Sequence, residues 1–233
     1  MRDSLTISSR TNYSSQHIKA ASFFARKAYA IQLTYSNGDI FDENIMMEYR
    51  SYSSSSIFLS VAFLEAIINE FFCDVSDEVI TGLSKDLDFK AITMIKRLWG
   101  QDVPRTASFR IIQKFDIALI ACEKESISKN EVLYSDITSL IQLRNALIHY
   151  EPVWNLIHSD EVSTDKGLSA KLKNKFSLNP FTGLGNAFFP DKCIAHGCAE
   201  WAVNNAITFV DSFYKKIGLV PPYEISRVQL KTR

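Results

Sequence analysis

Glycine and proline are scarce in this chain of 233 residues, with 8 and 6 copies respectively. Both residue types interrupt helices, and folds built on many turns use them heavily. Their scarcity therefore favours long helices over a turn-rich β fold. Hydrophobic residues make up 46% of the chain, which indicates a globular protein with a sizeable core rather than a disordered one.

An excess of charge of either sign is also missing. The chain has 26 Lys and Arg residues and 26 Asp and Glu residues, so its formal net charge is zero. Proteins that coat nucleic acid without selectivity are usually strongly basic. The charge balance excludes that class and leaves local recognition of RNA open.

Signals for membrane insertion or export are not evident in the sequence. We find no uncharged apolar window long enough to span a membrane, and residues 1–16 have no apolar signal core. The cysteines lack the spacing of a disulfide scaffold; they are Cys73, Cys122, Cys193 and Cys198. We therefore expect reduced thiols, a cytoplasmic location and no membrane partner.

Apolar residues that recur every three or four positions predict helices along most of the chain. Four core helices are expected over residues 16–34, 54–75, 131–150 and 192–217, with another over 107–122 packed alongside and a shorter one over 81–99. Serine runs in mid-chain usually form loops, but the run 52–56 leads straight into a strong apolar stripe, so we interpret it as the start of the second core helix. Asp42 is expected to cap a separate helical segment that begins near Glu43. The pattern predicts an all-α, up-and-down bundle with additional short helices.

The stretch 151–191 has no sustained periodicity. Long irregular segments inside a compact domain are usually functional or disordered, and the aromatic residues of this one predict that it packs over the bundle. We expect one domain over residues 16–220, with a flexible tail over 1–15. A second tail is expected over 221–233, because the Pro221-Pro222 pair stops regular structure.

The stretch from Arg144 to Tyr150, with the sequence Arg-Asn-Ala-Leu-Ile-His-Tyr, ends the helix predicted over 131–150. On an ideal helix, Arg144 falls in the middle of the apolar stripe. A guanidinium cannot lose its proton, so burying it requires a carboxylate, a phosphate or a cluster of other acceptors. Either another element supplies the partner, with Glu65 the obvious carboxylate, or the site is a cleft open to an anion.

Asn145 and His149 are four residues apart and share one helix face, while His149 lies about 140° round the helix from Arg144. This geometry suits a groove bordered from two sides, or a site completed by a second copy of the helix across a dimer axis. Histidine can take or give a proton near neutral pH, and Arg144 can stabilise the charge that develops on a phosphate. The plain alternatives are a His149 satisfied by the helix end and an Asn145 that is a simple polar residue of the last turn.

The Arg-Asn-x-x-x-His pattern at the end of an apolar helix resembles the signature of the HEPN superfamily of helical ribonucleases and nucleotide-binding proteins. The run Phe63-Leu64-Glu65-Ala66-Ile67-Ile68-Asn69-Glu70 is similar to the second core helix of several bacterial HEPN-like families. The resemblance implies catalytic roles for Arg144, His149 and Asn145. It also implies supporting roles for Glu65, Asn69 and Tyr150. Some HEPN toxins carry a regulatory Tyr two residues after the His, but that position here is Glu151, so we expect Tyr150 to serve core packing.

The activity that this resemblance implies is a metal-independent endoribonuclease. Attack of a ribose 2′-OH on the adjacent phosphate would leave 2′,3′-cyclic phosphate and 5′-OH ends, with no cofactor. Family members commonly dimerise with the two motifs facing one cleft. The implied setting is a toxin, abortive-infection or antiviral defence system, with RNA as substrate and a cognate antitoxin or defence-system partner.

Other polar residues give weaker indications. Lys171, Lys173 and Lys175 have the charge to follow an RNA backbone, although charge-rich loops are usually just solvated. Cys193, His196 and Cys198 resemble a partial metal set, but on a helix the three side chains point in different directions, so we expect no metal. The stretch 183–186 is not a dinucleotide fingerprint, because no strand precedes it.

Two other functions fit the same residues. The main rival is a non-catalytic HEPN-like module that binds a nucleotide, an RNA or a partner protein through the same cleft. The other is a plain helical scaffold in which Arg144 is locked to Glu65. Burial of Arg144 with no open cleft would favour the scaffold.

Overall fold

The computed structural model describes residues 10–36, 42–77, 86–103, 109–152 and 167–233. Within these ranges every regular element is a helix, which confirms the predicted all-α class. In chain order they are α1 Ser14–Tyr35, α2 Glu43–Ser76, α3 Phe89–Gly100, α4 Ile111–Ala121, α5 Val132–Ile148, α6 Leu168–Leu172, the π-type turn η2 Phe188–Lys192, α7 His196–Ile217 and the 3-10 helix η3 Glu224–Leu230.

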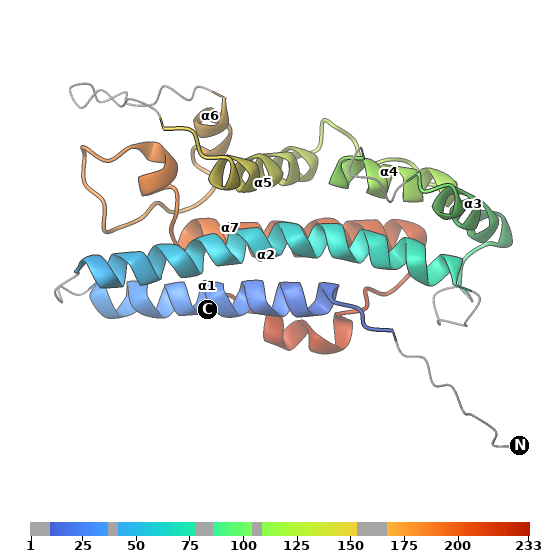
Figure 1. The fold of residues 1–233 in the computed structure, drawn as a ribbon, viewed down its shortest axis with the longest axis horizontal. Coiled ribbons are helices and arrows are strands. Elements are labelled where there is room, and N and C mark those ends of the chain that lie inside the picture. Colours follow the sequence, from blue (N-terminus) through green and yellow to red (C-terminus); the bar gives the residue numbers. More distant parts are fainter. Residues whose placement is uncertain (1–9, 37–41, 78–85, 104–108, 153–166) are drawn as a thin grey trace, which may run out of the picture.

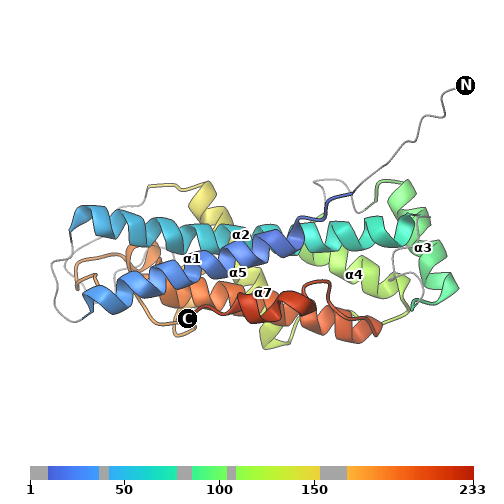
Figure 2. The same ribbon diagram turned by 90° about the horizontal axis from the view of Figure 1, so that it is seen from below.

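Helices α1, α2 and α7 lie side by side along the long axis of the molecule (Figures 1 and 2). The Tyr49 hydroxyl near the start of α2 donates to Gln32 near the end of α1, at 2.7 Å. The same hydroxyl accepts the backbone N–H of His196 at the start of α7, at 2.9 Å. Helix α1 therefore runs antiparallel to α2 and α7, and one tyrosine joins all three.

Helices α4 and α5 cover the face of α2 and α7 that is opposite α1 (Figure 1). Figure 2 shows α5 crossing α2 and α7 steeply instead of running beside them. The up-and-down alignment that we predicted for all four core helices therefore does not extend to α5. The C-terminal end of α5 emerges on the side of α2 that faces away from α7.

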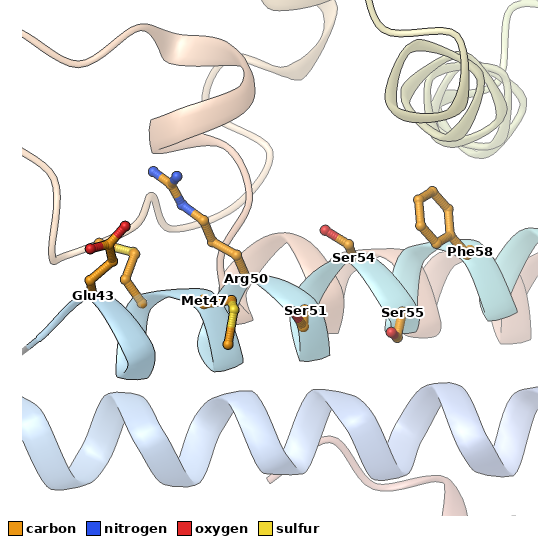
Figure 3. Close-up of a pocket in the computed structure, with 8 residues that line it drawn as sticks. Glu43, Met47, Arg50, Ser51, Ser54, Ser55 and Phe58 are labelled. Carbon is orange, nitrogen blue, oxygen red and sulfur yellow. The ribbon is translucent and has the colours of Figure 1, made fainter.

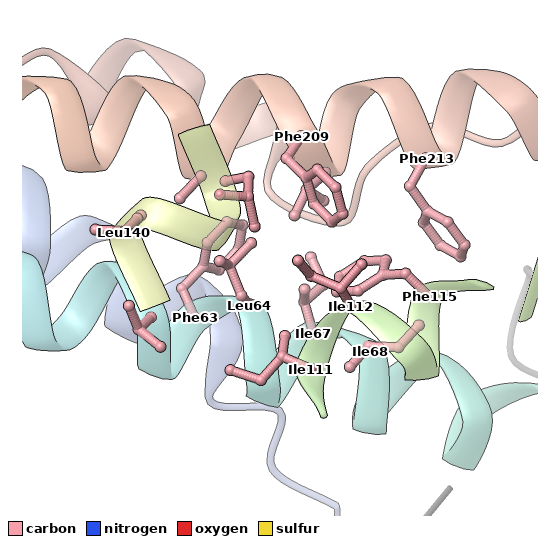
Figure 4. Packing of buried hydrophobic residues seen from close by; sticks show 14 of the residues in the cluster. Phe63, Leu64, Ile67, Ile68, Ile111, Ile112, Phe115, Leu140, Phe209 and Phe213 are labelled. Atoms are coloured by element: carbon pink, nitrogen blue, oxygen red, sulfur yellow. The ribbon is translucent and has the colours of Figure 1, made fainter. Parts of the chain in front are cut away.

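Aromatic and branched side chains from α2, α4, α5 and α7 meet in the core between these layers (Figure 4). The Phe115 ring of α4 lies 5.0 Å from the rings of Phe209 and Phe213 on α7, in edge-to-face contact with both. Leu140 of α5 is fully buried in the same cluster. Buried rings of this size contribute strongly to stability, so α4 is an integral part of the core, whereas we had predicted that it packs alongside a core of four other helices.

Helix α2 is continuous from Glu43 to Ser76, so the segment expected from Glu43 and the core helix expected over 54–75 are one helix that includes the serine run 52–56. Asp42 caps this whole helix, as its side chain accepts the backbone N–H of Ile45 at 2.9 Å. Two serine hydroxyls are satisfied within the helix: Ser53 donates to the Tyr49 carbonyl and Ser60 to that of Ser56. Serine is also small, and α1 and α7 face the core with buried alanines, so the three helices can pack closely.

The helix ends differ from the predictions in several places. Helix α3 begins at Phe89 behind the cap Asp88, and the start expected near 81 lies outside the described residues. Helix α7 begins at His196 and not at the predicted residue 192, because η2 extends to Lys192 and residues 193–195 separate it from α7. Helix α4 spans Ile111–Ala121, slightly shorter than the predicted 107–122.

Residues 221–233 are not the tail that we predicted, because η3 forms beyond the proline pair and packs against α1. Tyr223 is fully buried, and its hydroxyl donates to Asp211 at 2.7 Å. At the other end, residues 1–9 of the predicted tail lie outside the described residues. Arg10 pairs with Asp74 and Asp77 at 2.7 and 2.9 Å, so the segment just before α1 is anchored to α2.

By length and composition, α2 contains a segment apolar enough to cross a membrane, with a mean hydropathy of 1.7. The window expected to be absent was an uncharged one, and within α2 the uncharged run extends only over 51–64, between Arg50 and Glu65. More than half of that segment is buried inside the protein. Burial between α1, α7 and α4 is typical of a core helix, and this is the role that α2 has in the bundle.

The serine run allows a matched test of buried hydroxyls. Ser56 Oγ is buried and has no hydrogen-bond partner in the part of the chain that the structure describes, whereas Ser53 Oγ has one. Both Ser→Ala changes gain the same helix propensity. Ser56→Ala should therefore raise the free energy of unfolding by about 1–2 kcal/mol relative to Ser53→Ala, measured by urea denaturation. Equal values for the two variants would contradict this account.

Candidate functional site

The C-terminal end of α5 carries the motif that the sequence singled out. The helix is held by fully buried side chains, Ile137, Leu140 and Leu143, and it ends at Ile148, short of the predicted 150. His149 is the C-cap residue, and its backbone N–H donates to the Asn145 carbonyl at 2.8 Å. The side chains of Asn145 and His149 are both exposed, so this face of the helix end is open to solvent.

Arg144 is half-buried, and its guanidinium is not locked into the fold. Its Nε is out of contact with solvent and has no hydrogen-bond partner among the residues that the structure describes. Over the same residues, Arg144 forms no ion pair with a carboxylate. A buried guanidinium nitrogen without an acceptor is costly, so this position favours an incoming anion.

Glu65 and Asn69, predicted to support Arg144, are turned towards a different cation. Lys114 of α4 forms an ion pair with Glu65, and its ammonium group also donates to Asn69 Oδ1 at 3.1 Å. The Lys114 side chain is only 3% exposed, against 40% for Glu65. The prediction that Glu65 is the partner of Arg144 is therefore wrong. Helical periodicity could not identify Lys114 as the partner of Glu65, because periodicity marks apolar positions and Lys114 is a charged residue on a largely apolar helix.

The end of α5 is linked to α2 through the segment around η2. The Tyr150 ring lies 6.2 Å from the Phe189 ring, so Tyr150 packs at this edge and not in the core, being half exposed. Two residues on, Asp191 accepts from Arg50 of α2 at 3.0 Å and from Asn186 at 3.3 Å. A chain of direct contacts thus joins the motif to the N-terminal half of α2.

A hollow of about 560 Å³ lies along this part of α2 (Figure 3). Its lining includes Glu43, Met47, Arg50, Ser51, Ser54 and Phe58. Figure 3 shows Arg50 and Ser54 extending away from α1, with α5 drawn nearly end-on above Phe58. Sequence reasoning missed this hollow, because it treated the segment from Glu43 and the core helix from 54 as separate elements, whereas they form one helix. The spacing of the polar residues in this segment could have revealed the hollow. They recur three or four positions apart, which places them on one outer face of a helix.

The three lysines proposed for RNA have different surroundings. Lys175 pairs with Asp136 of α5, and Lys171 donates to Gln142 of α5 at 3.0 Å. These two side chains fasten the α6 region to α5, so a structural role explains them. Lys173 is exposed and is the one of the three that remains available to a ligand in the described structure.

The cysteines and histidine near the start of α7 pack into the core. Cys193 and Cys198 are hydrogen-bonded to each other, and burial raises the pKa of the Cys198 thiol well above its usual value. The His196 ring makes a tilted contact with the Tyr29 ring, with centroids 4.8 Å apart, and its Nε2 lies 3.3 Å from the Thr232 carbonyl oxygen. Over the described ranges, no group of three or more His, Cys, Asp or Glu side chains is placed to hold a metal.

Comparison with known proteins gives no match: no protein-family model, no curated protein and no solved structure resembles this chain closely enough. The chemistry of the candidate site is therefore argued from its own geometry and from the motif.

The Lys114–Glu65 pair can be tested by a double-mutant cycle. Glu65→Leu should lower the free energy of unfolding by about 1–3 kcal/mol, because it leaves a buried ammonium with a weaker set of acceptors. Lys114→Met should be close to neutral, and in that background Glu65→Leu should cost almost nothing. The matched control is Arg144→Met, in which the cost of Glu65→Leu should be unchanged. A cost that disappears with Arg144→Met instead would restore Glu65 as the partner of Arg144.

His196 should make stability depend on pH. Burial lowers the pKa of its imidazole below the ordinary 6.5, partly opposed by the Thr232 carbonyl and by Glu200. Just below pH 6.5 the unfolded chain therefore binds a proton that the folded chain does not. Stability should be fully present above this pH and fall as the pH drops further. His196→Gln should flatten the profile measured by thermal unfolding between pH 7 and 5, and an unchanged slope would contradict this role.

Proposed function

We propose that the protein is a metal-independent endoribonuclease of the HEPN type. The observation that carries this proposal is the state of Arg144: a half-buried guanidinium with an unpartnered Nε, beside the exposed side chains of Asn145 and His149. Its most obvious carboxylate partner, Glu65, is engaged by Lys114. A fixed positive charge with spare donors next to a group that can transfer protons is what RNA cleavage by 2′-OH attack requires.

The chemistry assigns one role to each residue. An imidazole takes the proton from the ribose 2′-OH, and the 2′-oxygen forms a bond to the adjacent phosphorus as the bond to the 5′-oxygen breaks. Arg144 stabilises the negative charge that builds on the phosphate oxygens, and Asn145 donates a hydrogen bond to them. The 5′-oxygen leaves with a proton from a second acid, so the products are a 2′,3′-cyclic phosphate and a 5′-OH.

A second acid is needed because one imidazole cannot be base and acid in the same displacement. Each chain carries one motif, at a helix end that projects from the bundle (Figure 2). We therefore propose a homodimer that brings two such ends to one cleft, with a HEPN-like helical arrangement. The zero net charge fits a local RNA site better than a general affinity for nucleic acid. A cytoplasmic toxin or antiviral defence system, with an antitoxin or defence partner, is the proposed setting.

The alternative function is a non-catalytic module that binds a nucleotide, an RNA or a partner protein. The hollow beside the end of α5 is the observation that favours it, because a binding module needs a recess but no proton transfer. A plain scaffold is disfavoured, since the Arg144–Glu65 lock on which it depends is not formed.

The test is cleavage of total and transfer RNA by the purified protein in EDTA. His149→Ala and Arg144→Ala should each lower the cleavage rate by about 10²-fold or more, because each removes a group that acts in the transition state. Matched controls are His17→Ala on α1 and Arg97→Ala on α3, which should cleave like the wild type. The wild type should leave 2′,3′-cyclic phosphate ends, identified by mass spectrometry.

Equal background cleavage by the wild type and both motif variants, all folded by circular dichroism, would count against the ribonuclease. Binding of RNA without cleavage under the same conditions would favour the non-catalytic module.

A further inference from the structure

The hollow along α2 takes no part in the proton transfers just described, yet it has the features of a binding site. Its lining residues 43, 47, 50, 54 and 58 recur every three or four positions, so they form one face of the helix. This face runs for about 22 Å, from the 1.5 Å rise per residue. Helix α2 packs most extensively against α1 and α7, and the residues of this face line the hollow in the part of the chain that the structure describes.

The serine hydroxyls on this face are available. Ser53 and Ser60, which are buried, donate to carbonyls one turn back. For Ser51 and Ser54, which line the hollow, the described structure gives no hydrogen-bond partner. A hydroxyl both donates and accepts, so these groups can match a ligand edge that mixes donors and acceptors.

Arg50 is held in place with part of its hydrogen-bonding capacity unused. One nitrogen, Nη2, donates to Asp191 at 3.0 Å, while Nε is enclosed and has no partner within the described ranges. Asp191 offsets the charge of Arg50, and Glu43 adds a negative charge at the far end of the hollow. This balance does not favour a phosphate here, whereas among the described residues Arg144 forms no ion pair with a carboxylate.

Apolar surface completes the hollow. Phe58 offers a ring below α5 (Figure 3), and the Met47 side chain is 64% exposed. Unpaired bases bind proteins by stacking on aromatic rings and on guanidinium planes, with their edges hydrogen-bonded to polar groups. The volume, about 560 Å³, falls within the range of pockets that hold small organic ligands.

The hollow and the motif belong to one continuous surface. Helix α5 crosses above Phe58, and its C-terminal end emerges on the outer side of α2 (Figures 2 and 3). Tyr150 contacts Phe189, and Asp191 contacts Arg50. A single RNA strand bound by its phosphate at Arg144 can therefore continue along this surface towards the hollow.

We propose that this hollow is a base-binding subsite for single-stranded RNA. An unpaired base stacks on Phe58, its edge is hydrogen-bonded by Ser51, Ser54 and the Arg50 guanidinium, and the adjoining phosphate lies at Arg144. The subsite rests on the proposed function, because it is the strand cleaved at the motif that fills it.

Binding is measured by fluorescence anisotropy with labelled single-stranded RNA twelve-mers of A, C or U. They carry 2′-fluoro groups in place of 2′-OH and so cannot be cleaved. Phe58→Leu, which keeps apolar volume but removes the ring, should weaken binding about five- to a hundred-fold. Ser54→Ala should weaken it about two- to ten-fold. Phe23→Leu on α1 and Ser135→Ala on α5 are the matched controls and should bind like the wild type.

The salt dependence of binding separates base contacts from phosphate contacts. Arg144→Ala should reduce the slope of log affinity against log salt by about 1, as expected for the loss of one phosphate contact. Phe58→Leu should leave this slope unchanged while lowering affinity. A labelled RNA duplex of the same length should compete poorly, because its bases are not free to stack on the ring.

A cross-linking experiment locates the base directly. A 2′-fluoro RNA that carries a single 4-thiouridine should cross-link, on irradiation, to the segment 43–58 in the wild type and lose this cross-link in Phe58→Leu. Cross-links confined to other segments, or affinities unchanged in both hollow variants, would overturn the subsite. Failure of the wild type to bind any of the RNAs would also overturn it, and the hollow would then be assigned to a protein partner.

The outcomes also separate the subsite from the catalytic proposal. Cleavage by the wild type with unchanged binding in Phe58→Leu would leave the ribonuclease standing and remove the subsite. Binding and cross-linking at 43–58 without any cleavage would leave the subsite standing in a non-catalytic module.

Discussion

The ion pair between Lys114 and Glu65 determines which charged groups remain available at the candidate site. It fastens α4 to α2 and satisfies a lysine that would otherwise be buried alone. It also engages the carboxylate that the sequence suggested as the partner of Arg144. The guanidinium at the end of α5 is left with unused donors, and the anion chemistry proposed there follows from that.

Much of the fold could be predicted because its signals are local. Helical periodicity identified the core helices, and the Asp42 cap was recognised from residue type alone. The union of the segment from Glu43 with the core helix from 54 was not predicted, because a serine run does not by itself show that a helix continues. The close packing of α1 and α7, with their buried alanines, explains why small residues stand there. The C-terminal 3-10 helix was missed for a similar reason, since Tyr223 is held by Asp211 of another helix.

The site was predictable in its residues but not in its geometry. The motif placed Arg144, Asn145 and His149 at a helix end, and they are there. The steep crossing of α5 over α2 depends on side chains from several helices, which no pattern within one helix records. The position of Arg50 in the hollow depends on its contact with Asp191, between residues far apart in the chain. Long-range pairs of this kind set the environment of a motif.

The serine run of α2 serves two surfaces at once, and this makes it sensitive to changes of length. Ser53, Ser56 and Ser60 point into the bundle, whereas Ser51 and Ser54 line the hollow. Each residue turns an α-helix by about 100°. An insertion or deletion of one residue within the run would therefore rotate one half of α2 against the other and misplace both faces. This segment should therefore tolerate substitutions better than insertions or deletions, because only substitutions leave the directions of both helix faces unchanged.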